Sequence, residues 1–244
     1  MSEPVITVEG LTIGWGERVL MQDLTFDVPP GDVFAILGGS GSGKSTLLRN
    51  MIGLEVPMSG RVAIRGVGED DDGRPSFGVL FQSGALFGSM TVGENVALPL
   101  EQWTTLDRAS IDAIVHAKLA LVGLGGSEDQ LPSEISGGMK KRAGIARALA
   151  LDPPIIFLDE PSAGLDPVSS VELDNLIRTL SDALGVTTVI VTHELQSIFA
   201  IVKHCIMLDR DARGIIARGD PRELRDGSAD PRVARFLNRR AGEG

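Results

Sequence analysis

The sequence is poor in cysteine and in aromatic residues, and it has no tyrosine. Among its 244 residues there are one cysteine, two tryptophans and eight phenylalanines. A single cysteine excludes an intramolecular disulfide and argues against a cysteine-based metal site. Cys205 stands in the apolar run HCIMLDR, so we expect a thiol buried in a strand, with a structural role.

Long apolar runs and an excess of positive charge are also missing. No apolar run approaches the ~20 residues that span a bilayer, and the start MSEPVITVEG lacks the basic and apolar regions of a signal peptide. We therefore expect a cytoplasmic protein; if it works at a membrane, other chains must supply the spans. The net charge of −10 argues against nucleic acid as a partner, because nucleic acid binding depends on cations that neutralise phosphates.

Apolar runs that are hydrophobic on both faces indicate an α/β fold. Three such runs, at 32–37, 154–160 and 187–193, are typical of parallel strands covered by helices on each side. Residues 5–28 instead predict two strands around the turn-like GWGE. Residues 88–150 lack β-rich runs and predict a helical insertion. The sequence therefore predicts an α/β core with an N-terminal antiparallel β-subdomain and an inserted α-helical subdomain.

We predict one domain over residues 1–244. Between two of the predicted strands, Asp166 fits a helix N-cap, Pro167 the first helical position and Gly185 the C-cap. The apolar face of that helix is predicted to carry Val168, Leu176, Ile177, Leu180 and Leu184. The predicted parts are the core with its β-subdomain (1–87 and 151–220), the helical subdomain (88–150), a C-terminal helix with tail (221–244), and a solvated acidic loop at 68–73.

The stretch GGSGSGKST fits the phosphate-binding pattern G-x-x-x-x-G-K-[ST]. It follows a predicted strand and opens a predicted helix, which is the context that this pattern requires. Glycines let backbone N–H groups point at phosphate oxygens, the lysine adds positive charge, and the serine hydroxyl suits Mg²⁺. The predicted nucleoside triphosphate site comprises Gly38, Gly39, Ser40, Gly41, Ser42, Gly43, Lys44, Ser45 and Thr46.

Polar residues end other predicted core strands. Asp159 and Glu160 close IIFLDE, and because side chains alternate along a strand they are expected to take different roles. Asp159 suits the Mg²⁺ shell, whereas Glu160 suits a general base for an attacking water. His193 ends IVTH, at the sheet edge where ligands collect, and is expected to contact the γ-phosphate. Gln82, after FGVLF, is a candidate for Mg²⁺ or the water.

A second glycine-rich helix start lies in SEISGGMKKRAGIARALA, residues 133–150. Three cations (Lys140, Lys141 and Arg142) stand at this start, where positive charge opposes the helix dipole. An anion would be held there by backbone N–H groups and by the cations. The sequence therefore predicts two phosphate-facing helix starts in one chain.

Together these residues resemble the nucleotide-binding subunits of ABC transporters, over nearly the whole chain. GGSGSGKST resembles the Walker A loop, IIFLDE the Walker B strand with its catalytic glutamate, and SGGMKKR the family signature, with Met139 where glutamine is commonest. FQ (81–82), SAGLD (162–166) and TH (192–193) resemble the Q-loop, D-loop and H-loop. The resemblance implies a P-loop NTPase (RecA-like) core, with ATP and Mg²⁺ as cofactors and hydrolysis of ATP as the activity.

The same resemblance explains the second helix start. Two ABC subunits pack head to tail, and ATP lies between the Walker A loop of one and the signature of the other. A homodimer is therefore implied, with the cations of the helix start facing the partner's ATP, Lys141 the least of them. The residues implied to bind nucleotide from this side are Ser136, Gly137, Gly138 and Asp166.

Trp15, in IGWGE, matches the aromatic residue that stacks on adenine in this family. A tryptophan that covers the edge of the core is the alternative. Four apolar residues after Gln82 also have two interpretations. Either Leu86, Phe87, Met90 and Val92 form a surface that receives a short permease helix, or they pack internally.

Longer stretches resemble the ATPase of the Mla-type phospholipid transport system of Gram-negative bacteria, a relative of Mce-associated lipid-import ATPases. These stretches are LFQSGALFGSMTVGENVALPL, LPSEISGGMKKRAGIARALAL and DPRVARFL. The resemblance implies integral-membrane permease subunits and a periplasmic lipid-binding (MCE-type) subunit as partners. The segment 66–77 is shorter and more acidic than its family counterpart. The alternatives are the ATPase of another ABC transporter with a different substrate, and a soluble ABC ATPase.

Overall fold

The computed structural model describes residues 3–66 and 74–238. The chain forms two compact units, unit 1 from residues 1–65 and 187–244 and unit 2 from residues 66–186. These units divide the chain at other residues than the predicted subdomain boundaries, which remain a prediction. The acidic stretch 68–73 lies outside the described residues. No helix in the described part of the chain has the length and hydropathy to cross a membrane.

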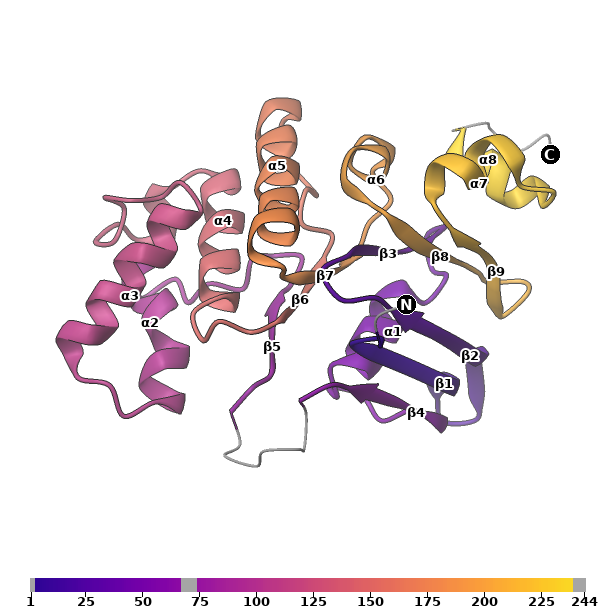
Figure 1. The fold of residues 1–244 in the computed structure, drawn as a ribbon, viewed down its shortest axis with the longest axis horizontal. Helices are drawn as coiled ribbons and strands as arrows, with labels where there is room; N and C mark the ends of the chain where they lie inside the picture. Colours follow the sequence, from indigo (N-terminus) through magenta and orange to yellow (C-terminus); the bar gives the residue numbers. More distant parts are fainter. Residues whose placement is uncertain (1–2, 67–73, 239–244) are drawn as a thin grey trace. The chain divides into compact units, whose positions relative to one another are not determined.

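Unit 1 begins with an antiparallel sheet of three strands in the order β2-β1-β4 (Figure 1). The hairpin register runs from Ile6 opposite Val28 to Trp15 opposite Arg18, which confirms the predicted turn at GWGE. Burial alternates over most of β1, as expected for a strand with one face against the core. The strands are β1 (Ile6–Trp15), β2 (Arg18–Val28) and β4 (Ser59–Ile64).

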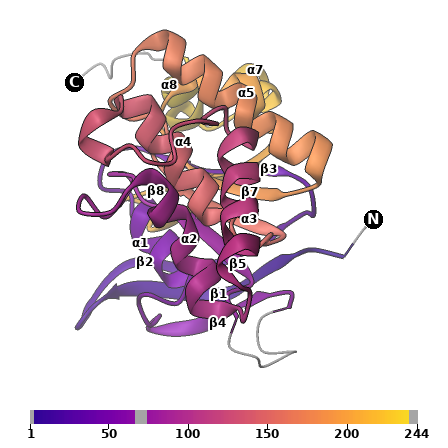
Figure 2. The same cartoon turned by 90° about the vertical axis from the view of Figure 1, so that its left-hand side faces the viewer.

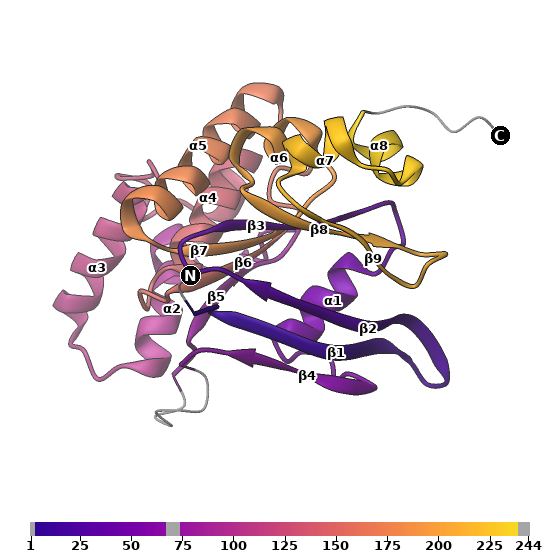
Figure 3. The same ribbon diagram turned by 45° about the vertical axis from the view of Figure 1, so that its right-hand side comes forward.

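The second sheet of unit 1 carries its parallel strands. β3 pairs in parallel with β7 and with β8, and β9 adds an antiparallel edge to β8. Every residue of β3 and β7 is buried, which confirms the interpretation of their apolar runs. Figure 3 shows α1 with the strands β1, β3 and β7 that it contacts. The elements are β3 (Val33–Gly38), α1 (Lys44–Met51), β7 (Thr187–Val191), α6 (Leu195–Ile201), β8 (His204–Asp209), β9 (Gly214–Gly219), α7 (Pro221–Gly227) and α8 (Pro231–Leu237).

Unit 2 combines one parallel strand pair with four α-helices in its described residues. β5 and β6 pair from Phe77 opposite Ile155 to Leu80 opposite Leu158. The helices α2, α3 and α4 contact one another (Figure 2), and α5 contacts α4. The helical character predicted for 88–150 is confirmed. The elements are β5 (Phe77–Leu80), α2 (Val92–Trp103), α3 (Arg108–Leu121), the short 3₁₀ turn η1 (Pro132–Glu134), α4 (Gly137–Ala148), β6 (Ile155–Asp159) and α5 (Pro167–Leu184).

The ends of α5 follow the prediction, and its buried face follows it only in part. Asp166 caps the helix, and Gly185 at the C-cap has φ 69°. Leu173, which was not predicted, is buried together with Ile177 and Leu180. Val168 and Leu184 are instead 69% and 54% exposed. At 100° per residue, Val168 lies on a different face from Leu173, and Leu184 is the last residue of the helix.

The segment after Gln82 is an ordered loop held from inside. Val92 is fully buried, so it belongs to the core; Leu86 and Met90 are half-buried, and only Phe87 of these four is mostly exposed. The buried Asn95 amide accepts a hydrogen bond from Phe87 N (2.8 Å) and donates to the carbonyl oxygens of Phe87, Met90 and Thr91. Internal packing therefore explains most of this apolar run.

Cys205 is buried as expected, and two histidines pair with carboxylates away from the motifs. The Cys205 thiol is buried in β8 and donates to Gly219 O at 3.3 Å. Burial, followed by the charge of Asp220, raises the pKa of this thiol to about 12. His204 Nδ1 lies 2.5 Å from Asp32 Oδ2, and His116 Nδ1 lies 2.9 Å from Glu128 Oε1.

Close packing of α4 against β5 explains two glycines of unit 2. A Cβ atom at Gly78 would lie 2.0 Å from Ala148 O, and one at Gly144 would lie 2.5 Å from Leu80 Cδ1 and 3.2 Å from Gly84 O. Neither glycine has a left-handed backbone, so the reason is space. The helix and the strand that leads to Gln82 are therefore packed backbone to backbone.

The Gly78→Ala substitution tests this packing. Because its new methyl group meets a backbone oxygen that cannot rotate away, we expect a loss of about 2–3 kcal/mol in the free energy of unfolding. Urea denaturation of the purified protein measures that loss. Gly88→Ala is the matched control, since no atom lies within 4 Å of its Cβ position. Equal stability of the two variants would contradict the close approach.

Candidate nucleotide site

The loop at 38–46 connects β3 to α1 in unit 1, as the pattern requires. Gly43 precedes the helix with φ 82°, and Gly38 ends the strand with φ 147°. A Cβ atom at Gly38 would lie 2.5 Å from Ser42 Oγ and 2.6 Å from Leu208 O. Only glycine therefore allows the chain to turn here and to present the first N–H groups of α1, which have no partner within the helix.

The lysine of the loop folds back over it. Lys44 Nζ donates to Gly38 O at 2.9 Å and to Gly39 O at 3.0 Å. The positive charge is thereby kept above the glycines, where phosphate oxygens would be expected.

Two other predicted residues belong to the same unit as this loop. Val191 ends β7 directly beside β3, opposite Ile36, so His193 leaves the same sheet edge as the loop. Its side chain is 57% exposed, with Nε2 3.7 Å from Glu194 Oε1. Trp15 is 52% exposed at the hairpin tip.

The hairpin also reaches the loop. A Cβ atom at Gly43 would lie 2.9 Å from Leu20 Cδ2 in β2. The sheet that carries Trp15 thus contacts the phosphate-binding loop through Leu20, and unit 1 contains the loop, the exposed tryptophan and His193.

Unit 2 holds the predicted acids. Asp159 ends β6 with 7% of its surface exposed, and Glu160 follows with φ 48°. Lys141 of α4 reaches both this turn and the Q-loop, because its Nζ donates to Gln82 O and, at 3.3 Å, to Glu160 O. The Gln82 side chain is exposed. Lys141 therefore connects the Q-loop to the Asp159–Glu160 turn within unit 2. The sequence did not predict this role for the lysine.

The expectation that the cations of this helix start face a partner's anion is wrong for Lys141 and Arg142. Lys141 is only 6% exposed; burial lowers its pKa, while the charges of Asp159 and then Glu160 oppose that effect. Arg142 donates to Glu172 Oε2 at 2.6 Å. Helical spacing could have indicated the burial of Lys141, since residues 141, 144, 145 and 148 fall on one buried face of α4.

The signature and the D-loop meet at two helix starts. Ser136 caps α4, its Oγ accepting from Met139 N at 3.2 Å. Asp166 caps α5, accepting from Val168 N and Ser169 N at 3.0 Å each. The Ser169 hydroxyl, 2.5 Å from Asp166 Oδ2, is the largest cause that lowers the pKa of Asp166.

The two helix starts are close neighbours. A Cβ atom at Gly138 would lie 3.4 Å from Ser169 Cβ, and one at Gly137 would lie 3.7 Å from Leu165 Cδ2. Two N-terminal dipoles therefore lie side by side in unit 2, and this arrangement favours an anion.

Each unit carries an oxygen donor of the kind that Mg²⁺ prefers. In unit 1 this is the Ser45 hydroxyl at the start of α1, and in unit 2 it is the buried Asp159 carboxylate at the end of β6. In the described part of the chain no group of three or more His, Cys, Asp or Glu residues could hold a metal alone. Mg²⁺ usually keeps waters and takes substrate phosphates beside one or two carboxylates, so phosphates and waters would complete the shell.

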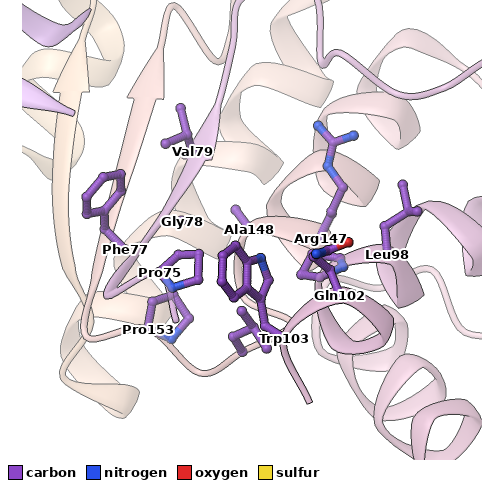
Figure 4. Close-up of a pocket in the computed structure, with 12 residues that line it drawn as sticks. Pro75, Phe77, Gly78, Val79, Leu98, Gln102, Trp103, Arg147, Ala148 and Pro153 are labelled. Carbon is purple, nitrogen blue, oxygen red and sulfur yellow. The ribbon is translucent and has the colours of Figure 1, made fainter. Parts of the chain in front are cut away.

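A separate pocket of about 390 Å³ lies elsewhere in unit 2. It borders β5, the end of α2 and the end of α4, and Figure 4 shows Trp103 and Arg147 among its lining residues. Most of the other lining side chains are apolar, so the pocket offers no cluster of groups for phosphate chemistry.

Comparisons with known proteins agree with these geometries. The family model described as ABC transporter matches residues 21–163. The probable ribonucleotide transport ATP-binding protein mkl of Mycobacterium leprae (strain TN) is 45% identical over 96% of this chain and 69% of its own length. The intermembrane phospholipid transport system ATP-binding protein MlaF is 39% identical in Haemophilus influenzae, over 97% of this chain and 91% of its own. In Escherichia coli K12, MlaF is 40% identical over 91% and 84%.

Solved structures share the fold. The cbiO1 protein of Clostridium perfringens, part of the ABC transporter complex cbiONQ, is 29% identical with a TM-score of 0.81, covering 98% of this chain and 96% of its own. A dimeric ATP-binding cassette, MJ0796, bound to ADP and Pi in a post-hydrolysis state, is 29% identical with a TM-score of 0.77, over 88% and 98%. With the predicted α/β cassette fold confirmed, the chain belongs to the ABC transporter family as an ATP-hydrolysing subunit.

Proposed function

We propose that this ATPase powers transport of phospholipid between the inner and outer membranes. The observation that carries the proposal is its similarity to MlaF over nearly the whole chain, at 39–40% identity. The mkl relative is 45% identical and is named for ribonucleotide transport, so the competing substrate class is a ribonucleotide.

We assign one ATP to the loop 38–46 of each chain. Lys44 would neutralise the β- and γ-phosphates, while Ser45, Gln82 and Asp159 would hold Mg²⁺ with the phosphates, which supplies charge neutralisation and orientation. The loop geometry and the buried carboxylate support this assignment.

Hydrolysis then needs a base for the attacking water and a contact to the γ-phosphoryl group that is transferred to it. Glu160 would accept a proton from the attacking water, and His193 would donate to the γ-phosphate. The position of His193 at the same sheet edge as the loop supports its role.

A homodimer would complete each site. Ser136, Gly137 and Gly138 at the start of α4 would contact the ATP held by the partner's loop, with Asp166 beside them. The two neighbouring helix starts of unit 2 support this proposal, as does the dimer in the MJ0796 structure.

The transport system would supply the membrane part. We propose a complex with integral-membrane permease subunits and a periplasmic lipid-binding (MCE-type) subunit, with this chain peripheral on the cytoplasmic face of the inner membrane. Its net charge of −10 speaks against a nucleic acid partner.

Copurification tests the transport assignment. The tagged chain is extracted from native membranes in mild detergent, and the bound proteins and lipids are identified by mass spectrometry. A permease together with a lipid-binding subunit and phospholipid is expected. A permease that retains ribonucleotide and no phospholipid would overturn the lipid assignment while leaving the ATPase intact.

Glu160→Gln tests the base and the dimer together. Turnover of ATP should fall at least a hundredfold, because no group accepts the proton of the water, and ATP-bound dimers should accumulate in size-exclusion chromatography. Adding Ser136→Arg to the same chain should abolish those dimers while ATP stays bound to the monomer. Normal turnover in Glu160→Gln would exclude Glu160 as the base.

Trp15→Ala tests adenine stacking. Loss of a stacked aromatic costs roughly 1–3 kcal/mol, so ATP affinity should fall about tenfold without unfolding. Since the chain has no tyrosine and two tryptophans, a Trp103→Phe protein leaves Trp15 as the sole indole, whose fluorescence should change on ATP binding. Affinity of Trp15→Ala within twofold of the parent would contradict the stacking.

A further inference from the structure

We propose that Lys141 and Arg147 of α4 are positioning residues that clamp the Q-loop and the Glu160 turn to the signature helix. This pair is called the α4 clamp below. The inference rests on the proposed role of Glu160 as the base, and it adds a physical link between that base and the signature.

The clamp binds carbonyl oxygens of turns that are strained. Glu160 and Ala85 have left-handed backbones (φ 48° and 46°), which residues other than glycine seldom adopt. Gly84, next to Ala85, has φ 76°. Lys141 Nζ donates to Glu160 O at 3.3 Å. Arg147 Nη1 donates to Ala85 O at 2.7 Å and Nη2 to Gly84 O at 3.3 Å. Each of these three carbonyls is thus held by a cation of one helix.

Lys141 also ties the two turns to each other. The same Nζ donates to Gln82 O as well as to Glu160 O. One ammonium group therefore bridges the Q-loop and the turn of the base, so that displacement of either turn relative to the other breaks a buried hydrogen bond.

The helix beneath the clamp is close to the strand that feeds the Q-loop. Gly144 lies between the two cations on the helix, where a Cβ would meet Leu80 and Gly84 O, and Gly78 abuts Ala148 O. Backbone contact of this kind leaves little room for sliding. α4, the Q-loop and the Glu160 turn should consequently move as one body.

Burial of the cations is costly and has to be compensated. Burial lowers the pKa of both Lys141 and Arg147, and the charges of Asp159 and Glu160 raise that of Lys141. A buried cation is kept where hydrogen-bond acceptors and opposite charge surround it. Lys141 meets that condition through two carbonyl oxygens and the charges of Asp159 and Glu160, and Arg147 meets the hydrogen-bonding part of it through two carbonyl oxygens.

The consequence is a connection between the two ATP sites of a dimer. Glu160 would serve the ATP of its own chain, whereas Ser136 at the start of the same α4 would serve the ATP of the partner. Binding of the partner's ATP at the start of α4 would thus change the position of Glu160 through Lys141, within one chain.

Lys141→Met tests the clamp, because it keeps the length of the side chain and removes its charge and its donors. We expect kcat for ATP hydrolysis to fall at least tenfold while KM changes less than twofold, since the loop at 38–46 is untouched. Lys141→Arg should recover most of the activity. An unchanged kcat per folded molecule for Lys141→Met would overturn the proposal.

Lys118→Met is the matched control. The Lys118 side chain is also largely buried, and its Nζ pairs with Asp152, away from both clamped turns. It should lower the melting temperature without changing kcat. If Lys118→Met slowed turnover as much as Lys141→Met, general destabilisation would explain both, and the clamp would be rejected. Should Lys141→Met fail to fold, Lys141→Gln and Arg147→Lys are measured in the same way.

A double-mutant cycle separates this inference from the proposed function. If Lys141 acts through Glu160, Lys141→Met should slow a Glu160→Gln protein less than twofold further. A full additional tenfold loss would overturn the clamp. Normal turnover of Glu160→Gln alone would remove the premise of Glu160 as base, whereas slow Glu160→Gln with normal Lys141→Met would reject only the clamp.

Discussion

The close packing of α4 against β5 is the constraint on which the catalytic half of unit 2 depends. Gly78 and Gly144 bring the helix and the strand into backbone contact, and Lys141 and Arg147 can reach the turns after β5 and β6 because the helix lies so near. Any larger residue at either glycine would push α4 away from these turns. Packing therefore comes first, and the polar contacts follow from it.

The charged groups of the chain have two different roles: some lie at helix starts where phosphates would bind, and others are buried against backbone carbonyl oxygens. The chain has a net charge of −10, yet the sites that phosphates would occupy are helix starts. Lys44 lies at the start of α1, and capped backbone N–H groups lie at the starts of α4 and α5. Because screening limits exposed charges to about 8 Å at physiological salt, these local groups decide anion binding. Lys141 and Arg147 instead donate hydrogen bonds to backbone carbonyl oxygens of the Q-loop and the Glu160 turn.

The proposed site residues are accordingly divided between the two units. Unit 1 offers the phosphate-binding loop, the exposed Trp15 and His193 from strands of one sheet. Unit 2 offers the acids and the signature, both tied to α4. This division suits the proposed homodimer, and the similar cassette MJ0796 is a dimer in its solved structure.

The sequence by itself determined the first hairpin, the apolar core strands, the loop at 38–46, the Asp166 cap and the family, because glycine, proline, capping residues and apolar periodicity act over a few neighbouring residues. The strands β4 and β9 were not predicted. The sequence did not show that Lys141 turns inward, that Arg142 pairs with Glu172, that Leu173 replaces Val168 on the buried face of α5, or that Val92 enters the core. Those outcomes depend on which face of a helix another element covers. Only the tertiary structure decided them. Lys141, for example, can hold two turns only because the fold places the carbonyl oxygens of Gln82 and Glu160, which are distant in sequence, beside its amine.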